Sequence, residues 1–382
     1  MDTETIAACA LNTIFGFQPR LGKALLDAVG SAGEIFRLSR DSLRSLTGPS
    51  SQWLSQLTPS ALERAEKELD AAAKEGARFI PLSDPDFPAL LRECEDPPMG
   101  LYFKSSDSPG NVFGGRPAIA IVGTRDMDSY GREWCQRLVE ALASCREKPV
   151  IVSGLALGVD GCAHQAALDA GLPTIAVMAT GIDRVYPFRH GLLASRIACS
   201  PGCALLTDYP TGTAPIAIHF LRRNRIIAGL SVATVLIESK KKGGGMLTAQ
   251  LASSYGRALY ALPGRADDTR SQGCNILIRQ QLAEAVTDPE SFIQSLGLGP
   301  VKRKVRDIAA DAAAFYADEP DDSRRRLLAA FDFIRKHREC GAEELASALG
   351  CGFPEASAAA ARLESDGFIA TDIMGRCSIR IK

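Results

Sequence analysis

Apolar residues in the middle of the chain form short continuous runs that alternate with longer amphipathic stretches. Apolar strands alternating with helices predict an α/β fold, with a parallel sheet covered by helices on both faces. The predicted strands are Ile119–Val122, Val150–Val152, Thr174–Met178, Ala204–Leu206, Ala233–Ile237 and Ala258–Ala261, and the predicted helices are Tyr130–Ala143, Val159–Ala170, Pro215–Ala228 and Met246–Tyr255.

The pattern changes before this core. Residues 1–75 place apolar side chains at helical spacing, with glycines at the turns, which predicts a small helical-hairpin module. Such modules can hold DNA phosphates on backbone amides. Acidic residues outnumber basic ones here, which favours a packing or protein-contact role. The proline-rich stretch 81–98 is predicted to be extended, because proline disrupts helices and central strands.

The pattern changes again after the core. Residues 298–323 begin with Gly-Leu-Gly-Pro and are predicted to be a linker. Residues 324–382 predict three helices and a hairpin, the order of a winged helix. An acidic third helix favours a protein-contact or regulatory role for this domain, with DNA contact through the wing as the alternative. The helices are expected at Arg324–Arg335, Ala342–Leu349 and Pro354–Ser365, and the hairpin joins Gly367–Ile369 to Cys377–Ile381 through Met374 and Gly375.

Composition narrows the classes of function. The chain has 382 residues, 46% of them hydrophobic, and a net charge of −1, so any site for a polyanion must be local. A P-loop, a GxGxxG fingerprint and a CxxC pair are all missing from the sequence, and neither a cofactor nor a metal is expected. With no secretory signal at the start and no membrane-spanning run, we expect a cytoplasmic protein without a membrane partner.

Small and basic residues follow the predicted strands. Gly123, Thr124 and Arg125 come after the first strand, and Ser153 and Gly154 come after the second. The carboxyl ends of parallel strands form one crevice, where glycines and helix starts can bind an anion. Simple turn geometry is the alternative explanation.

A second basic group lies in the helix predicted at Pro215–Ala228. It contains Phe220, Arg222, Arg223, Asn224 and Arg225. An aromatic ring beside arginines suits single-stranded nucleic acid, since bases stack on rings while guanidinium groups meet phosphates. An exposed helix end with solvated charges remains the alternative.

Three lysines ending at Lys242 precede the glycine turn around Gly244. These lysines either hold phosphates or solubilise the surface. Asp160, His164, Asp183 and Glu238 are the candidate acid–base residues. Asp160 and His164 are four apart on one predicted helix and form either a hydrolytic pair or a structural one.

Four motifs, the fourth with a continuation, resemble the DNA-processing protein A family (DprA/Smf). Their order along residues 80–285 makes the resemblance specific. They are Ile119–Arg125 with Tyr130-Gly131; Ile151–Ala156 with Gly158–Asp160, Ala163 and His164; Gly181–Asp183 with Tyr186-Pro187; Phe220 with Arg223–Leu230; and Glu238, Gly244, Thr248-Ala249 and Pro263-Gly264, continuing to Gly273, Asn275 and Leu277-Ile278.

The resemblance implies an extended Rossmann-like core at 76–297, a helical SAM or helix-hairpin-helix-like module at 1–75 and a winged helix at 324–382. It implies a non-catalytic homodimer, joined through the Rossmann core, that binds single-stranded DNA without base specificity. It also implies that the protein protects incoming DNA and loads a RecA-type recombinase during natural transformation. The implied pocket residues are Gly123, Arg125, Ser153, Gly154, Phe220, Arg223, Asn224 and Arg225, with Gly244 nearby.

The chain departs from the family pattern at Thr207-Asp208, Leu221, Gly243 and Gln281-Leu282. The last of these puts the dimer surface in question. The alternative function is a phosphoribohydrolase-like enzyme that cleaves nucleotide derivatives, with Asp160 or Glu238 as base. The run Gly243–Thr248 only partly matches the glycine-rich motif expected of such enzymes.

Overall fold

A computed structural model describes residues 2–48, 51–299, 308–337, 340–372 and 375–379. The chain forms two compact units, Met1–Lys302 and Arg303–Lys382, which are described separately.

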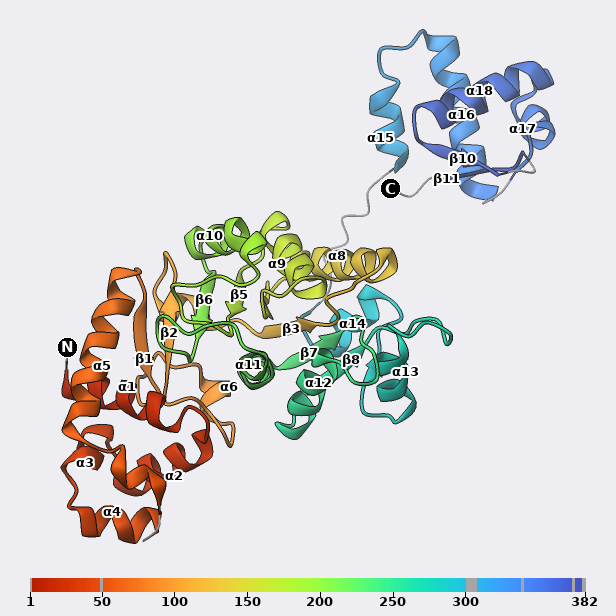
Figure 1. Ribbon diagram of the computed structural model, residues 1–382. Coiled ribbons are helices and arrows are strands. Elements are labelled where there is room, and N and C mark those ends of the chain that lie inside the picture. Colours follow the sequence, from red (N-terminus) through yellow and green to blue (C-terminus); the bar gives the residue numbers. More distant parts are fainter. Residues whose placement is uncertain (1, 49–50, 300–307, 338–339, 373–374, 380–382) are drawn as a thin grey trace. The chain divides into compact units, whose positions relative to one another are not determined.

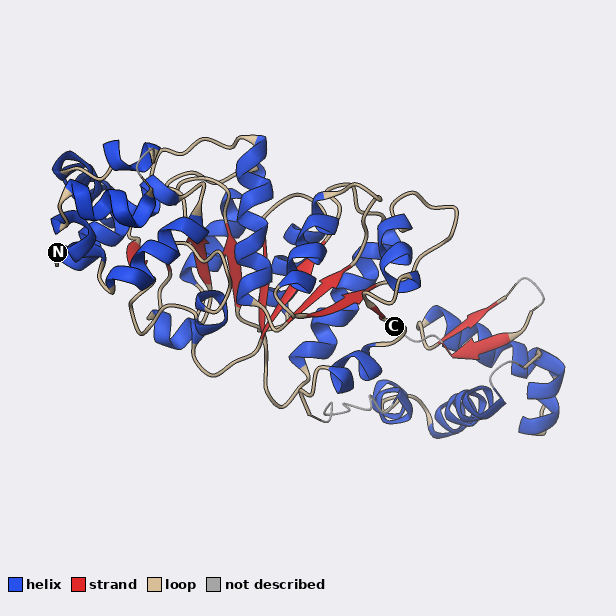
Figure 2. Cartoon of the chain, turned by 90° about the horizontal axis from the view of Figure 1, so that it is seen from below, coloured by secondary structure: helices blue, strands red, loops and turns tan. Residues whose placement is uncertain are grey.

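A nine-stranded sheet runs through the first unit, in the order β1-β2-β6-β5-β4-β3-β7-β8-β9 (Figures 1 and 2). From β6 to β9 the neighbouring strands are parallel, and β2 and β1 add an antiparallel edge. The α/β prediction is confirmed, and the six predicted strands are present to within one residue at each end. The strands are β1 (Arg78–Pro81), β2 (Gly100–Lys104), β3 (Ala118–Val122), β4 (Val150–Ser153), β5 (Thr174–Val177), β6 (Ala204–Thr207), β7 (Ala233–Leu236), β8 (Ala258–Ala261) and β9 (Glu284–Ala285).

Helices cover both faces of this sheet (Figure 1). Side chains alternate along β3, so Ile121 packs in the cluster of α8 and α9, while Val122 packs in the cluster of α11 and α12. The helices of the core are α6 (Ala89–Arg92), α7 (Pro109–Phe113), α8 (Ser129–Ala143), α9 (Val159–Asp169), α10 (Gly191–Cys199), α11 (Ala217–Leu230), α12 (Gly244–Ser254), α13 (Gln272–Arg279) and α14 (Pro289–Ser295), with a 3₁₀ turn, η2, at Phe188–His190.

The N-terminal helices share one hydrophobic cluster with the antiparallel edge of the sheet. Phe15 and Leu69 are buried in it together with Phe79 and Tyr102. The module is helical, as predicted, and it is packed onto β1 and β2. Its helices are α1 (Thr3–Phe15), α2 (Pro19–Val29), α3 (Ala32–Arg37), α4 (Arg40–Thr47), η1 (Gln52–Ser55) and α5 (Pro59–Lys74).

The turn between α2 and α3 holds a carboxylate of the protein itself. Glu4 accepts hydrogen bonds from the backbone amides of Ala32 at 2.7 Å and Gly33 at 2.9 Å, and from the Ser31 hydroxyl at 2.7 Å. Burial opposes ionisation of Glu4, but these hydrogen bonds outweigh it and lower the pKa of the carboxyl. A DNA phosphate at this turn would have to displace Glu4, which favours the packing role.

The proline-rich stretch is not extended throughout. Pro81 ends β1 and Pro88 immediately precedes the short helix α6. Proline is compatible with both positions. At the end of an edge strand and at the start of a helix, no hydrogen bond is needed from the backbone N–H that proline lacks. The prediction of an extended stretch is therefore wrong at α6, and the edge strands β1 and β2 were not predicted.

The second unit contains the predicted three helices followed by a hairpin. Helix α15 precedes them, inside the range 298–323 predicted as a linker. Tyr316 is fully buried in the cluster of this unit, and its hydroxyl donates to Asp366 at 2.8 Å. From α15 onward the range is therefore part of the unit, and Met374 lies outside the described residues. The elements are α15 (Ile308–Phe315), α16 (Asp321–His337), α17 (Ala342–Leu349), α18 (Phe353–Ser365), β10 (Ile369–Thr371) and β11 (Cys377–Ile379).

Candidate nucleic-acid interface

A pocket of about 630 Å³ opens at the carboxyl ends of β3 and β7. The chain order reverses here, because β4 lies on one side of β3 and β7 on the other. Such a switch point is where open α/β sheets place their ligands. Eight of the twelve predicted site residues line the pocket: Gly123, Thr124, Arg125, Phe220, Arg223, Asn224, Lys242 and Gly244.

The loop after β3 reaches the pocket through close backbone packing. A Cβ at Gly123 would lie 2.6 Å from Val159 Cγ2 and 2.9 Å from the Glu238 carbonyl oxygen, so only glycine fits. The Thr124 amide donates to that same carbonyl at 2.8 Å. These contacts fix the backbone and leave the Arg125 side chain exposed at the pocket.

Three flat side chains follow one another at the mouth. The Arg125 guanidinium lies 5.0 Å from the centre of the Phe220 ring, and the Tyr186 ring meets Phe220 edge-on at 5.5 Å. Phe220 comes from α11, and Tyr186 comes from the loop after β5. Cation–aromatic packing of this kind positions a guanidinium beside a surface on which a base can stack.

Arg223 forms an inner wall of the pocket. Its guanidinium is buried and donates to the backbone carbonyls of Gly154, at 2.5 Å, and Val177. Burial lowers the pKa of Arg223 to about 10, opposed by the charge of Asp160, and the side chain remains cationic at neutral pH. Arg223 therefore supplies fixed positive charge and joins the ends of β4 and β5.

Ser153 and Gly154 do not line the pocket. The Ser153 hydroxyl donates to the Ile121 carbonyl at 2.6 Å, and the Gly154 amide donates to the buried Asp160 carboxylate at 3.1 Å. A Cβ at Gly154 would overlap the Arg223 guanidinium. The amide predicted to receive an anion after β4 is thus engaged by the protein's own carboxylate, and both residues have a structural role.

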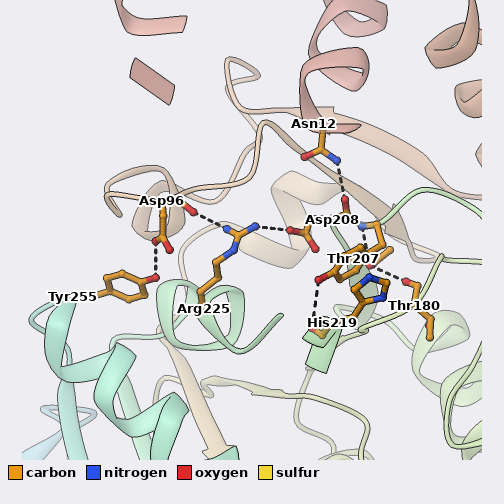
Figure 3. A network of polar contacts seen from close by, with 9 residues as sticks. Asn12, Asp96, Thr180, Thr207, Asp208, His219, Arg225 and Tyr255 are labelled. Carbon is orange, nitrogen blue, oxygen red and sulfur yellow. Dashed lines mark hydrogen bonds and ion pairs between the residues drawn. The ribbon is translucent and has the colours of Figure 1, made fainter. Parts of the chain in front are cut away.

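Arg222 and Arg225 lie on the side of α11 away from the pocket, contrary to the prediction that grouped them with Arg125. The Arg222 guanidinium lies 3.8 Å from the centre of the Phe17 ring in the N-terminal module. Arg225 is buried, forms an ion pair with Asp208 and donates to the Asp96 carbonyl at 2.6 Å. Figure 3 shows Arg225 between these two partners, with Asn12 donating to the Asp208 carbonyl at 2.8 Å.

The start of α12 forms another wall of the pocket. Gly243, at the N-cap of α12, has no side chain to cap the helix. The side-chain amide of Asn224 donates to the Gly244 carbonyl at 3.3 Å. A helix start presents backbone N–H groups and partial positive charge to an anion. Exposed Lys240 and Lys242 line the pocket next to it.

The charge of the pocket is positive on balance. Its lining contains four basic residues, Arg125, Arg223, Lys240 and Lys242, against the acidic residues Asp126 and Asp160. Asp160 already accepts two backbone amides, from Gly154 and Ala156. The pocket is therefore a local basic surface on a nearly neutral chain.

Of the two alternatives for Asp160 and His164, the contacts favour the structural one. The His164 ring lies against Thr174, with Nδ1 2.7 Å from the hydroxyl, and because that hydroxyl donates to the Ile151 carbonyl, Nδ1 is the donor. Burial, with the charges of His190 and Arg223, lowers the pKa of His164 to about 3. Asp183 accepts from the Gly212 amide at 2.8 Å. His164 and Asp183, like Asp160, therefore each make structural hydrogen bonds within the protein.

Glu238 shares a proton with a neighbouring carboxylate beneath the loop after β3. Burial, together with a hydrogen bond to the Asp128 side chain, raises the pKa of Glu238 to about 7. The same hydrogen bond lowers the pKa of Asp128, which also accepts from the Gly131 amide at 2.9 Å. The protonated Glu238 donates and the ionised Asp128 accepts.

A pH titration of stability should detect this proton. The folded state holds it up to a pH of about 7, whereas an unperturbed glutamate releases it near 4.5, so the contribution to stability is full below 4.5 and is lost as pH rises to about 7. We expect the substitution E238Q, which mimics the protonated form, to leave stability unchanged at the acid end and to raise it above pH 7. Urea midpoints across this range measure the difference, and parallel curves for the two proteins would contradict the shared proton.

Two further observations concern other classes of site. Within the described ranges, no three or more His, Cys, Asp or Glu side chains gather as metal ligands would. The described helices also include none with the length and apolar character needed to cross a membrane.

The family model of DNA recombination-mediator protein A matches residues 78–297, which is more than half of the chain. The chain belongs to the DNA recombination-mediator protein A family. It is 36% identical to Protein Smf of Synechocystis over 233 residues, which cover 61% of this chain and 57% of that protein. It is also 36% identical to DNA processing protein DprA of Bacillus subtilis over 228 residues, covering 60% of this chain and 74% of that protein. The chain thus matches just over half the length of the Synechocystis relative.

Two solved structures of DNA processing protein A share the fold. The protein from Streptococcus pneumoniae is 28% identical with a TM-score of 0.63, and the match covers 77% of this chain and 98% of that one. The protein from Helicobacter pylori is 30% identical with a TM-score of 0.51, and the match covers 58% and 97%. The Helicobacter pylori structure is described as revealing a single-stranded DNA binding mode. Family membership and the Rossmann-like fold inferred from the motifs are confirmed.

Sequence reasoning missed Tyr186 as a pocket residue, and of the three candidate lysines both Lys240 and Lys242 line the pocket. Tyr186 belongs to a family motif, but its place beside Phe220 depends on the loop after β5 folding over the switch point. The helical repeat could have indicated the pocket face of α11, since Phe220, Arg223, Asn224 and Ile227 recur at spacings of three and four and all line the pocket.

Proposed function

We propose that this protein binds single-stranded DNA without base specificity in the pocket between β3 and β7. The observation that carries the proposal is the series Arg125, Phe220 and Tyr186 at the mouth, backed by the positive wall of Arg223 and the start of α12. Stacking on a ring tolerates every base, and guanidinium and ammonium groups meet the phosphates. The binding mode described for the Helicobacter pylori relative supports the same ligand.

The proposed role follows from the family. DNA held in this way would be protected and passed to a RecA-type recombinase during transformation or recombination in the cytoplasm, by a homodimer joined through the Rossmann core. Leu282, at one of the departures from the family motifs, is 52% exposed near the end of that core. Sedimentation of the free protein tests the dimer, and recombinase filament assembly on coated DNA tests the loading step.

A titration of fluorescent oligonucleotides across salt tests the binding itself. We expect similar affinities for oligothymidylate and mixed-sequence single strands and weaker binding to duplex. The logarithm of the single-strand binding constant should fall linearly with the logarithm of salt, with a slope of about −0.7 for each phosphate neutralised. Equal binding to duplex, or no dependence on salt, would contradict the proposed pocket.

The same protein preparation separates this function from the hydrolase alternative. Incubation with nucleoside monophosphates followed by chromatography would detect released base if the pocket were catalytic. Asp160 accepts hydrogen bonds from two backbone amides, and Glu238 does not line the pocket. Neither carboxylate is therefore placed to act as a general base there. Release of the nucleobase would overturn the non-catalytic assignment.

A further inference from the structure

The segment after β5 carries exposed apolar side chains beside the pocket. Phe188 is 92% exposed and Leu192 is 84% exposed, in the turn η2 and the first turn of α10. Large apolar side chains rarely remain so open without a partner when they are grouped. Neither residue lines the pocket described above.

Phe188 lies close along the chain to the aromatic residues of the pocket. Tyr186 lines the pocket and packs on Phe220, and Phe188 follows it by two residues. Two residues span at most about 7 Å of chain, so the Phe188 backbone lies within that distance of Tyr186. A strand that leaves the pocket over Tyr186 is therefore within reach of Phe188.

The charges of this segment favour a polyanion as the occupant. Arg184 and Arg189 are both exposed, one on each side of Phe188 in the sequence. The acidic Asp183 is held by the Gly212 amide at 2.8 Å, and the His190 ring lies 2.9 Å from the Leu155 carbonyl. The two exposed arginines thus outnumber the single carboxylate, which already accepts a backbone amide, and they lie on either side of an exposed ring, as on a nucleic-acid surface where rings and cations alternate.

We propose that Phe188 is a second base-stacking residue, on which DNA leaving the pocket places a further base, with Arg184 and Arg189 near its phosphates. This inference rests on the proposed function and extends it, because it lengthens the site beyond the pocket. The bound strand then covers more nucleotides than the pocket alone accommodates.

A length series of labelled oligothymidylates tests the extension. We expect the substitution F188A to leave the affinity for the shortest binding oligomers unchanged and to weaken the longest by roughly 5- to 100-fold, the effect of losing one stacked base. Because Phe188 is almost fully exposed, the substitution should not disturb folding. F188W should restore long-oligomer binding, and its indole fluorescence should be quenched by the DNA.

Leu192 provides the matched control, since it is nearly as exposed but cannot stack. L192A should bind every length like the wild type. If F188A also binds every length like the wild type, the extension is wrong, and altered sedimentation of F188A would then indicate a protein-contact surface. If the wild type binds no oligomer, the proposed function itself fails, whereas loss confined to F188A with short-oligomer binding intact supports both.

Discussion

Replacing Arg225 with alanine is expected to lower the free energy of unfolding of the first unit by about 3–5 kcal/mol, because it leaves the buried Asp208 carboxylate without its cation. Arg225 and Asp208 are each less than a tenth exposed. Arg225 also holds the Asp96 carbonyl, and the Tyr255 hydroxyl donates to the Asp96 carboxylate at 2.6 Å (Figure 3). Urea denaturation followed by tryptophan fluorescence measures the loss, since both tryptophans, Trp53 and Trp134, belong to this unit.

The double substitution D208A/R225A tests whether the loss comes from the pair. We expect it to be less destabilised than the sum of the two single variants, because no unpaired charge remains. Under conditions where R225A is folded, its affinity for single-stranded DNA should stay close to that of the wild type. A stable R225A protein that had lost DNA binding would instead place Arg225 in the interface.

The substitution R125A is expected to have the largest effect on binding. Removing this guanidinium takes away a charge-assisted contact to phosphate, worth about 1.5–3 kcal/mol, and the cation packed on Phe220. The affinity for single strands should fall about 10- to 100-fold for every base composition, and the salt slope should become shallower by about 0.7. Fluorescence anisotropy at several salt concentrations measures both quantities.

Arg137 offers a matched control for this variant. Its guanidinium also lies over an aromatic ring, 4.8 Å from the centre of Trp134, but on α8 and outside the pocket. R137A should therefore bind like the wild type, and R125K should be intermediate, because an ammonium keeps the charge without the planar fork. Equal losses in R125A and R137A would show that general charge, and not the pocket, governs affinity.

The sequence predicted the parallel core well, because each buried strand is a continuous apolar run between clear turn residues. Short edge strands were harder: β1 and β2 bury residues against the N-terminal helices, and their proline-rich surroundings conceal that burial. The range 298–323 reads as polar linker, yet Tyr316 within it is buried in the second unit. Local composition does not show that a single side chain in a polar segment packs into a hydrophobic cluster formed by distant residues.

The candidate site was predicted in the same uneven way. Glycines and Arg125 at strand ends could be placed, because parallel topology brings those ends together. Composition could not separate the three arginines of the cluster Arg222–Arg225, because they carry the same charge but contact different parts of the protein from one helix. The partner that decides the position of Arg225 is Asp208, which directly follows strand β6. Only the packed structure shows which arginines face the pocket.

The hydrophobic cluster shared by the N-terminal helices and the first two strands determines where the chain can be truncated without unfolding the rest. A recombinant fragment trimmed to the family-matched region would begin at Arg78 and strip the cover from Phe79 and Tyr102. Each large side chain returned to water forfeits about 1.5–3 kcal/mol. We expect such a fragment to aggregate, whereas one ending near Lys302 and retaining the first helices should remain folded.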